Sequence, residues 1–292
     1  MQILDGKQLS IQLQEEIAAA VEQFKKEGKK TPHLAAVLVG DNPASQTYVN
    51  SKIKACKIVG FKSTLVRFNS NVAESELISA VQTLNNDDDV DGILVQLPLP
   101  EHVNEEKITD SISPLKDVDG FHPVNIGRMV KGLPAHLPAT PYGILLLLER
   151  FKIETRGKNC VVVGRSNIVG TPVSILLSRN TNPGNCTVTL AHSKTLNLPE
   201  ICRQADLLIA AIGRPDFIKA DWVKEGAVVI DVGINRVEDS SRKSGFRLKG
   251  DVDFDTVAPK CSFITPVPGG VGPLTIAALL MNTLHAVQSK NN

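Results

Sequence analysis

Short apolar segments alternate with segments of helix length along most of this chain, and this alternation restricts the fold more than any other feature. In the second half of the chain the apolar segments lack the polar–apolar alternation of a strand with one wet face. Such strands are typical of parallel sheets that helices cover on both faces. The predicted strands are LAAVLVG (34–40), FKSTLVRF (61–68), DGILVQLPLP (91–100), NCVVVG (159–164), CTVTLA (186–191), ADLLIAAIG (205–213), GAVVIDVG (226–233) and SFITPV (262–267).

The length of the chain and a pause in the pattern indicate an α/β protein of two domains. At 292 residues the chain exceeds most single domains, and the alternation pauses between residues 98 and 141. We expect one domain of residues 1–140 plus 273–292, a second of residues 141–272, and a ligand cleft between them. Helices are expected at about residues 10–27, 73–85, 104–111, 169–179 and 274–287, and from residue 43 onward.

Composition excludes several classes of partner. A formal net charge of +1 and an aromatic content of 4% provide no basic or stacking surface, so we expect neither nucleic acid nor a membrane. The longest apolar run, GILLLL at 143–148, is too short to span a bilayer. The five cysteines form no C-x-x-C pair and no apolar segment opens the chain, so we expect a cytoplasmic protein without a metal site.

A glycine turn in VVVGRSNIVGTPVSILL points to a bound dinucleotide. Gly164 ends a predicted strand and Gly170 opens a predicted helix, so the turn can bring a diphosphate to the backbone N–H groups of a helix N-terminus. The spacing meets the usual G-x-G-x-x-G pattern only in part, and a purely structural turn is the alternative. The further apolar strands behind the turn favour a Rossmann-type domain over residues 141–272.

The side chains around this turn favour NADP over NAD. An NAD site usually offers a carboxylate at the end of the second strand, but this strand ends in His192, Ser193 and Lys194. Arg165 adds a cation inside the turn, and guanidinium and hydroxyl groups complement a 2′-phosphate. A solvated loop charge is the alternative for Arg165. The other residues assigned to the cofactor side are Ser166, Gly233 and Ile234.

The stretch YVNSKIKACKIVG (48–60) places a lysine on an apolar helix face. At about 100° per residue, Val49, Ala55, Cys56 and Val59 fall near Lys52, while the other two lysines point away. A lysine in such a place either extends its ammonium group to water or is held in a pocket for its chemistry. Tyr48 lies one turn before Lys52 and on the same face.

Five motifs together resemble one enzyme family. They are YVNSKIKAC, DGILVQLPLP, PLKDVDGFHPVNIG, VVVGRSNIVG and ITPVPGGVGPLT, in this order. The chain resembles the bifunctional methylenetetrahydrofolate dehydrogenase/methenyltetrahydrofolate cyclohydrolase family from about Leu4 to its last helix. Ala139 in PATPYG replaces a cysteine that is frequent in the family, which excludes a thiol role at that position.

The resemblance implies NADP-dependent oxidation of 5,10-methylenetetrahydrofolate to the methenyl cation, and hydrolysis of that cation to 10-formyltetrahydrofolate. In such enzymes the residue matching Tyr48 stacks on the folate ring, and the residue matching Lys52 handles protons in hydrolysis. Gln96 matches the glutamine that positions the lysine, and Asp119 matches the aspartate that binds the pterin. The resemblance also implies a homodimer. The loop expected beside folate and nicotinamide contains Pro268, Gly269 and Gly270.

Chemistry supports these roles independently. Hydride transfer needs little from protein acids, since the cofactor carries it, whereas hydrolysis requires a group that takes and returns a proton. An amine in an apolar pocket beside a cationic substrate favours its neutral form, and the Gln96 amide orients it without adding a charge. Asp119 suits the adjacent N–H donors of an aminopyrimidinone.

Structural readings compete with each assignment. Lys52 can extend to water from an ordinary helix, Tyr48 can belong to a core, and Asp119, like Asp117, can stabilise a turn. Gln96 can simply end a strand. The alternative functions are an NADP dehydrogenase for another substrate, without hydrolase activity, and a nucleotide-sensing module without turnover.

Overall fold

The computed structural model describes residues 1–242 and 245–290, and these form two compact units. Unit 1 consists of residues 1–10 and 140–275, and unit 2 of residues 11–139 and the chain from residue 276 onward. The division falls within helix α1 (Gly6–Lys26) and helix α10 (Val271–Lys290).

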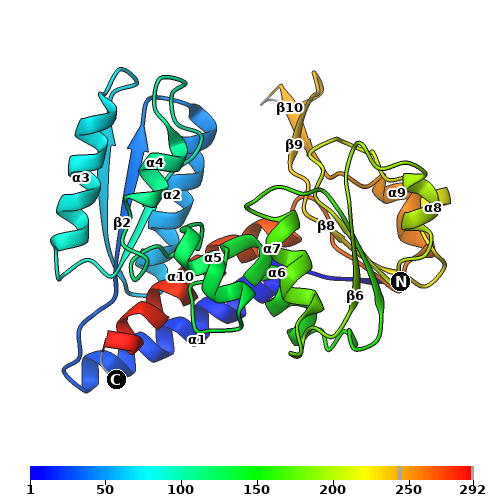
Figure 1. Ribbon diagram of the computed structural model, residues 1–292, viewed down its shortest axis with the longest axis horizontal. Coiled ribbons are helices and arrows are strands. Elements are labelled where there is room, and N and C mark those ends of the chain that lie inside the picture. The colour runs from blue at the N-terminus through cyan, green and yellow to red at the C-terminus, as the bar shows by residue number, and fades with distance from the viewer. Residues whose placement is uncertain (243–244, 291–292) are drawn as a thin grey trace. The chain divides into compact units, whose positions relative to one another are not determined.

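Unit 2 is built on a three-stranded parallel sheet in the order β3-β2-β4. Helices α2 and α3 lie to either side of β2 (Figure 1). Residues of α3, such as Leu77 and Val81, pack into the same core as Val37 of β2 and Ile93 of β4. The elements are β2 (His33–Val39), α2 (Pro43–Ile58), β3 (Lys62–Phe68), α3 (Glu74–Asn86), β4 (Gly92–Val95), α4 (Glu105–Asp110) and α5 (Pro123–Val130).

Local sequence explains where α2 begins. Asn42 caps the helix, because its side-chain oxygen accepts the N–H groups of Ala44 at 2.9 Å and Ser45 at 3.2 Å. Pro43 occupies the first turn, where its missing N–H costs nothing. Val49, Lys52, Ala55 and Cys56 are buried in the helix that follows, so its apolar face carries Lys52 inward.

Unit 1 is built on a six-stranded sheet in the order β1-β11-β8-β7-β5-β6, and every pairing in it is parallel. Strands β5, β7 and β8 are almost wholly buried, as their apolar sequences predict. The elements are β1 (Gln2–Ile3), α6 (Ala139–Arg150), β5 (Asn159–Val163), α7 (Gly170–Ser178), β6 (Thr187–Ala191), α8 (Leu198–Cys202), β7 (Leu207–Ala210), η1 (Ala220–Trp222), β8 (Val228–Asp231), α9 (Phe254–Val257), η2 (Ala258–Lys260) and β11 (Phe263–Ile264).

A separate antiparallel hairpin consists of β9 (Asn235–Glu238) and β10 (Phe246–Lys249). It lies apart from the parallel strands of its unit (Figure 1). The Arg236 guanidinium lies over the Phe246 ring, 4.6 Å from its centroid. This hairpin was not predicted from the sequence.

The N-terminal ten residues belong to a different unit from the predicted one, which placed all of residues 1–140 together. Strand β1 adds to the edge of the six-stranded sheet, where Gln2 N donates to Ser262 O at 2.7 Å and Leu4 N to Ile264 O at 2.8 Å. Lys7 N then donates to Gly269 O at 2.8 Å. A two-residue strand leaves almost no periodic signal, and these bonds span most of the chain.

Helix α10 is largely a core helix. One stretch among the described residues, Val271–Ser289, is long and apolar enough to cross a membrane, but 61% of its most apolar window is buried within the structure. In unit 2, the Asn282 side-chain amide donates to the carbonyls of Val118 and Leu137, each at 2.8 Å. The helix thereby holds the two ends of the segment that contains Asp119.

Candidate active site

The sheet of unit 2 brings the predicted catalytic residues to its carboxyl edge. Strand β3 pairs with β2 on one side and β4 pairs with β2 on the other. The side on which the chain adds strands therefore switches between β2 and β4, although all three strands are parallel. Ligands of open α/β sheets bind at such a point, outside the carboxyl ends of the strands. Gln96 follows β4 directly, and the backbone of Asp117 bridges to Ile93 beside it.

Lys52 is buried, with 8% of the residue exposed, among Val49, Ala55 and Cys56 on the inner face of α2. Its Nζ donates to Gln96 Oε1 at 3.3 Å. The Gln96 side-chain nitrogen donates in turn to Leu97 O at 2.7 Å, and this bond fixes which amide atom faces the lysine. The apolar face predicted around Lys52 is therefore present, and the amine does not extend freely to water.

Asp119 lies within electrostatic reach of Lys52. Burial raises the pKa of the Asp119 carboxyl above its usual value; the Lys52 ammonium opposes this rise and the Asp117 carboxylate adds to it. The structure therefore brings the amine and the amide into contact, and the carboxyl group is near enough to the amine to interact with it electrostatically.

Asp117 shapes the loop that carries Asp119. Its Oδ1 accepts the N–H groups of Gly120 at 3.2 Å and Phe121 at 3.3 Å. Its Oδ2 accepts His122 N at 2.8 Å and the Asn125 side-chain amide at 2.9 Å. Asn125 was not identified from the sequence, because its partner lies eight residues away in a segment without periodic pattern.

Tyr48 differs from the rest of the predicted helix face, because 44% of it is exposed. An exposed aromatic ring one turn from Lys52 is free to cover a planar ligand, whereas a core tyrosine would be packed away. The exposure of Tyr48 thus argues against a place in the core, and stacking on a ligand stays a prediction.

The glycine turn of unit 1 lies at the corresponding edge of the six-stranded sheet. The chain adds β6 on one side of β5 and β7 on the other, so the strand order switches sides between β5 and β7. Gly164 directly follows β5. A Cβ at Gly164 would lie 2.0 Å from Ala211 O, and one at Gly170 would lie 1.9 Å from Gly164 O. Only glycine lets the end of β5, the loop after β7 and the start of α7 approach this closely.

Ser166 caps the start of α7. Its Oγ accepts the N–H groups of Val169 at 3.2 Å and Gly170 at 3.4 Å, and its carbonyl accepts Thr171 N at 3.1 Å. The sequence analysis expected these N–H groups to face a diphosphate, but in this structure they bond within the turn. Both bonds to Oγ are long, and the hydroxyl keeps its own proton as a donor.

The predicted phosphate-binding side chains lie at neighbouring strand ends. Val163 at the end of β5 pairs with Ala191 at the end of β6, and Gly164 N donates to Ala191 O at 2.8 Å. Arg165 and His192 therefore follow neighbouring strands at the same edge of the sheet. The side chains of Arg165 and Ser193 are exposed, while His192 Nδ1 accepts Lys194 N at 3.2 Å.

The remaining predicted residues follow β8 and β11 at the same edge. Ile234 is 43% exposed, which is unusual for a large apolar side chain. A Cβ at Gly272 would lie 3.2 Å from Ile234 Cδ1, so the two segments are neighbours. Pro268 is exposed and Gly270 is buried, with Gly269 between them at a φ of +107°.

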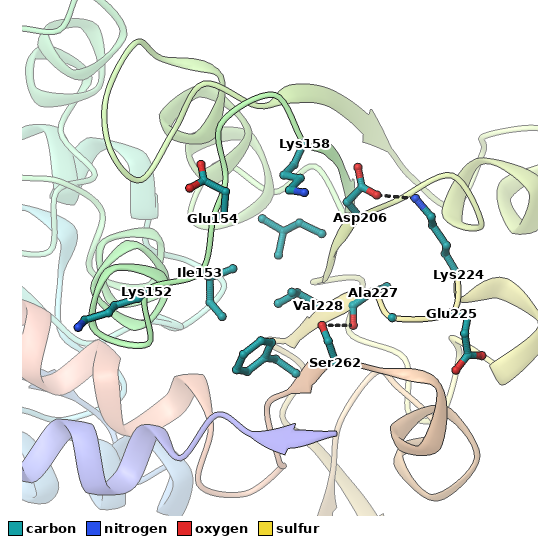
Figure 2. Close-up of a pocket in the computed structure, with 13 residues that line it drawn as sticks. Lys152, Ile153, Glu154, Lys158, Asp206, Lys224, Glu225, Ala227, Val228 and Ser262 are labelled. Atoms are coloured by element: carbon teal, nitrogen blue, oxygen red, sulfur yellow. Dashed lines mark hydrogen bonds and ion pairs between the residues drawn. The ribbon is translucent and has the colours of Figure 1, made fainter.

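A pocket of about 300 Å³ opens at the opposite edge of this sheet, where β5, β7, β8 and β11 begin (Figure 2). Two of its charged groups pair with each other: Lys224 Nζ donates to Asp206 Oδ1 at 2.5 Å. Because parallel sheets bind ligands at their carboxyl ends, this pocket lies on the wrong edge for the cofactor. Within residues 1–242 and 245–290, no group of three His, Cys, Asp or Glu could hold a metal ion.

Comparison with known proteins identifies both halves of the chain. Residues 4–119 match the catalytic domain of tetrahydrofolate dehydrogenase/cyclohydrolase, and residues 138–291 match the NAD(P)-binding domain of the same family. The bifunctional protein FolD of Cytophaga hutchinsonii is 63% identical over 290 residues, covering 99% of this chain and 100% of that protein. The FolD of Bacteroides fragilis is 59% identical over 286 residues, 98% of both chains.

Solved structures agree with these matches. The FolD methylenetetrahydrofolate dehydrogenase/cyclohydrolase of Campylobacter jejuni superposes with a TM-score of 0.93 at 49% identity and covers 99% of both chains. The enzyme of Trypanosoma brucei, solved with NADP and an inhibitor, has a TM-score of 0.94 at 37% identity and covers 99% of this chain and 98% of its own. This chain belongs to the tetrahydrofolate dehydrogenase/cyclohydrolase family.

Proposed function

We propose that this protein oxidises 5,10-methylenetetrahydrofolate with NADP and then hydrolyses the 5,10-methenyl product to 10-formyltetrahydrofolate. One observation carries the hydrolase half of the proposal: within a chain of this family, the buried Lys52 amine lies 3.3 Å from Gln96 Oε1. A structural lysine would have no need of burial beside a neutral amide.

Lys52 exchanges the protons that hydrolysis requires. A water molecule attacks the cationic methenyl carbon, a C–O bond forms, and the water proton passes to the neutral Lys52 amine. The bond from that carbon to one ring nitrogen then breaks, and the nitrogen takes the proton back from the ammonium group. The hydroxyl group on the carbon releases its remaining proton to solvent and becomes the formyl carbonyl. Gln96 orients the amine through its side-chain oxygen throughout both steps.

Asp119 and Tyr48 hold the folate. The Asp119 carboxylate accepts the adjacent N–H donors of the pterin, and the exposed Tyr48 ring stacks on its face.

The turn after β5 holds NADP. The glycine turn directly follows β5, at the carboxyl edge of the sheet between β5 and β7, where open α/β sheets bind dinucleotides. Arg165, His192 and Ser193 bind the 2′-phosphate, and Ser166 donates its hydroxyl proton to a phosphate oxygen. When bound, NADP supplies the hydride acceptor, and the residues of this chain orient it.

A two-step spectroscopic assay tests the proposal. NADP reduction is followed with 5,10-methylenetetrahydrofolate as substrate, and the decay of methenyl absorbance is then followed separately. We expect both activities in the natural protein and, in Lys52→Met, loss of at least about a hundredfold in hydrolysis with NADP affinity retained. Oxidation without enzymatic hydrolysis in the natural protein would instead indicate a dehydrogenase alone, and equal hydrolysis by the variant would remove Lys52 from the mechanism.

We further propose that the protein is a homodimer and that it is located in the cytoplasm. Sedimentation of the purified protein over a range of concentrations tests the first, and cell fractionation tests the second.

A further inference from the structure

We propose that Asp251 is a positioning residue for the dinucleotide site, because its carboxylate holds the loop after β7 and the segment after β8 in one arrangement. The inference rests on the proposed binding of NADP to unit 1. Asp251 lies in GDVD, between the β9–β10 hairpin and α9, and no part of the sequence analysis identified it.

The Asp251 carboxylate accepts four hydrogen bonds and is fully buried, with 0% exposed. Its Oδ2 accepts Ile212 N at 2.7 Å and Gly213 N at 2.8 Å. Its Oδ1 accepts Arg214 N and the Asn235 side-chain amide, each at 2.9 Å. Three consecutive backbone N–H groups thus converge on one anion, and the loop cannot change shape without breaking several of these bonds.

The loop that Asp251 holds lies beside the switch in strand order between β5 and β7. Residues 212–214 follow β7, and the crevice between β5 and β7 is where an open α/β sheet binds its ligand. The residue before this loop, Ala211, presents the carbonyl that comes within 2.0 Å of a Cβ at Gly164. A displacement of the loop therefore moves the wall against which the glycine turn packs.

Asp251 also fixes the segment after β8. Asn235 anchors to its carboxylate, and a Cβ at Gly233 would lie 2.3 Å from Oδ1, so this backbone is pressed against the carboxylate. Between them Ile234 exposes its side chain. Asp231 holds the backbone of Asp251 in place, because Asp231 Oδ1 accepts Asp251 N at 2.9 Å. One carboxylate thus sets the position of the segment after β8 that is assigned to the cofactor, and of the loop that follows the wall of the glycine turn at Ala211.

The substitution Asp251→Asn tests this role in the full-length protein. Asparagine keeps the shape but turns an NH₂ group toward N–H donors, so it cannot hold the loop. We expect the dissociation constants of NADP and of NAD, measured by calorimetry, to rise equally and by at least about tenfold, as expected for hydrogen bonds to a charged group. The rate of hydrolysis at saturating methenyl substrate stays within about twofold, because Lys52 and Gln96 lie in unit 2.

Asp253→Asn is the matched control. It makes the same chemical change two residues along, where the carboxylate forms a 3.2 Å ion pair with Lys219. We expect less than about a twofold change in NADP affinity, since partly exposed ion pairs contribute little.

Each outcome decides a separate question. A natural protein that does not bind NADP refutes the proposed function, whereas a natural protein that binds NADP and an Asp251→Asn variant that binds it equally well overturn this inference alone. Folding of unit 1 is checked by the fluorescence of Trp222, the one tryptophan of the chain. If Asp251→Asn does not fold, Asn235→Ala replaces it: removal of one of the four donors must weaken NADP and NAD alike, and unchanged affinity overturns the inference.

Discussion

Gln96 is a neutral partner for the Lys52 amine, and its neutrality is testable. In Gln96→Glu a carboxylate would take the position of an amide oxygen that lies 3.3 Å from Nζ. It would stabilise the ammonium form, so the amine would accept a water proton only at higher pH. We expect hydrolysis at neutral pH to fall at least about tenfold and its pH–rate profile to move to higher pH by about one unit or more.

Gln96→Ala is the control for that variant. It removes the orienting oxygen without adding charge, so hydrolysis falls while the position of the pH–rate profile stays close to that of the natural protein. Profiles that shift alike in both variants would show that charge at this position is unimportant.

Arg165 should decide between NADP and NAD. Its side chain is exposed in the glycine turn, at the strand end next to His192. We expect Arg165→Ala to weaken NADP by about 1.5–3 kcal/mol, the range for hydrogen bonds to a charged group, and NAD much less. Calorimetric titration with both nucleotides measures this. Lys158→Ala, an exposed cation at the opposite edge of the sheet, should change neither, and an equal loss of both nucleotides in Arg165→Ala would contradict the phosphate assignment.

Single residues were predictable where a local pattern defines their surroundings. Lys52 was identified from the angular spacing of its helix neighbours, and its burial agrees with that spacing. Asp251 was not identifiable in this way, because its partners at 212–214 lie 37 to 39 positions earlier in the sequence. A polar side chain that organises distant loops leaves no periodic trace.

At the scale of elements, the strands of the two parallel sheets were predicted from the sequence except for the two-residue β1, and the strands of the β9–β10 hairpin were missed. The predicted strand at 159–164 corresponds to β5 and the one at 226–233 contains β8. Helix α5 was missed within the stretch expected to be irregular, because Pro123 and Gly127 are typical of turns. The β9–β10 hairpin alternates intermediate with exposed side chains along β9, so it offers no buried face to recognise.

The start of α7 depends on the absence of a side chain at Gly170. A Cβ there would lie 1.9 Å from Gly164 O, and backbone must move to accommodate it. We expect Gly170→Ala to destabilise unit 1 by about 1–3 kcal/mol, as overpacking does, and to abolish measurable NADP binding. Urea unfolding followed by Trp222 fluorescence measures the first effect and calorimetry the second.

Gly127→Ala makes the same substitution in a helix where a Cβ would meet nothing within 4 Å. Alanine should stabilise that helix by about 0.5–1 kcal/mol through its higher helix propensity, and NADP binding should not change. Similar losses in both variants would mean that the crowding at Gly170 is not the cause.

For the whole molecule, the dependence of stability on pH is the sum of carboxyl groups that stabilise the fold more at high pH and others that stabilise it more at low pH. Six carboxylates have a pKa lowered by hydrogen bonds and nearby cations, so they stabilise the fold more as pH rises. They are Glu22, Glu27, Glu74, Asp89, Asp206 and Asp239. The contribution of Asp231 to stability changes with pH in the opposite direction. Burial raises the pKa of this carboxyl to about 7, despite N–H groups that favour its charged form.

Asp231→Asn separates this group from the rest. The folded protein holds a proton on Asp231 that the unfolded chain releases near its ordinary pKa of 3.8, so the stability contributed by this group is complete below that pH and is lost as pH rises toward about 7. Asparagine cannot titrate. Relative to the variant, the natural protein should therefore lose up to about 1.4 kcal/mol per pH unit across that interval, because one proton is released. Urea unfolding at a series of pH values, followed by Trp222 in the same unit, measures the difference, and a difference independent of pH would show that Asp231 titrates as an ordinary aspartate.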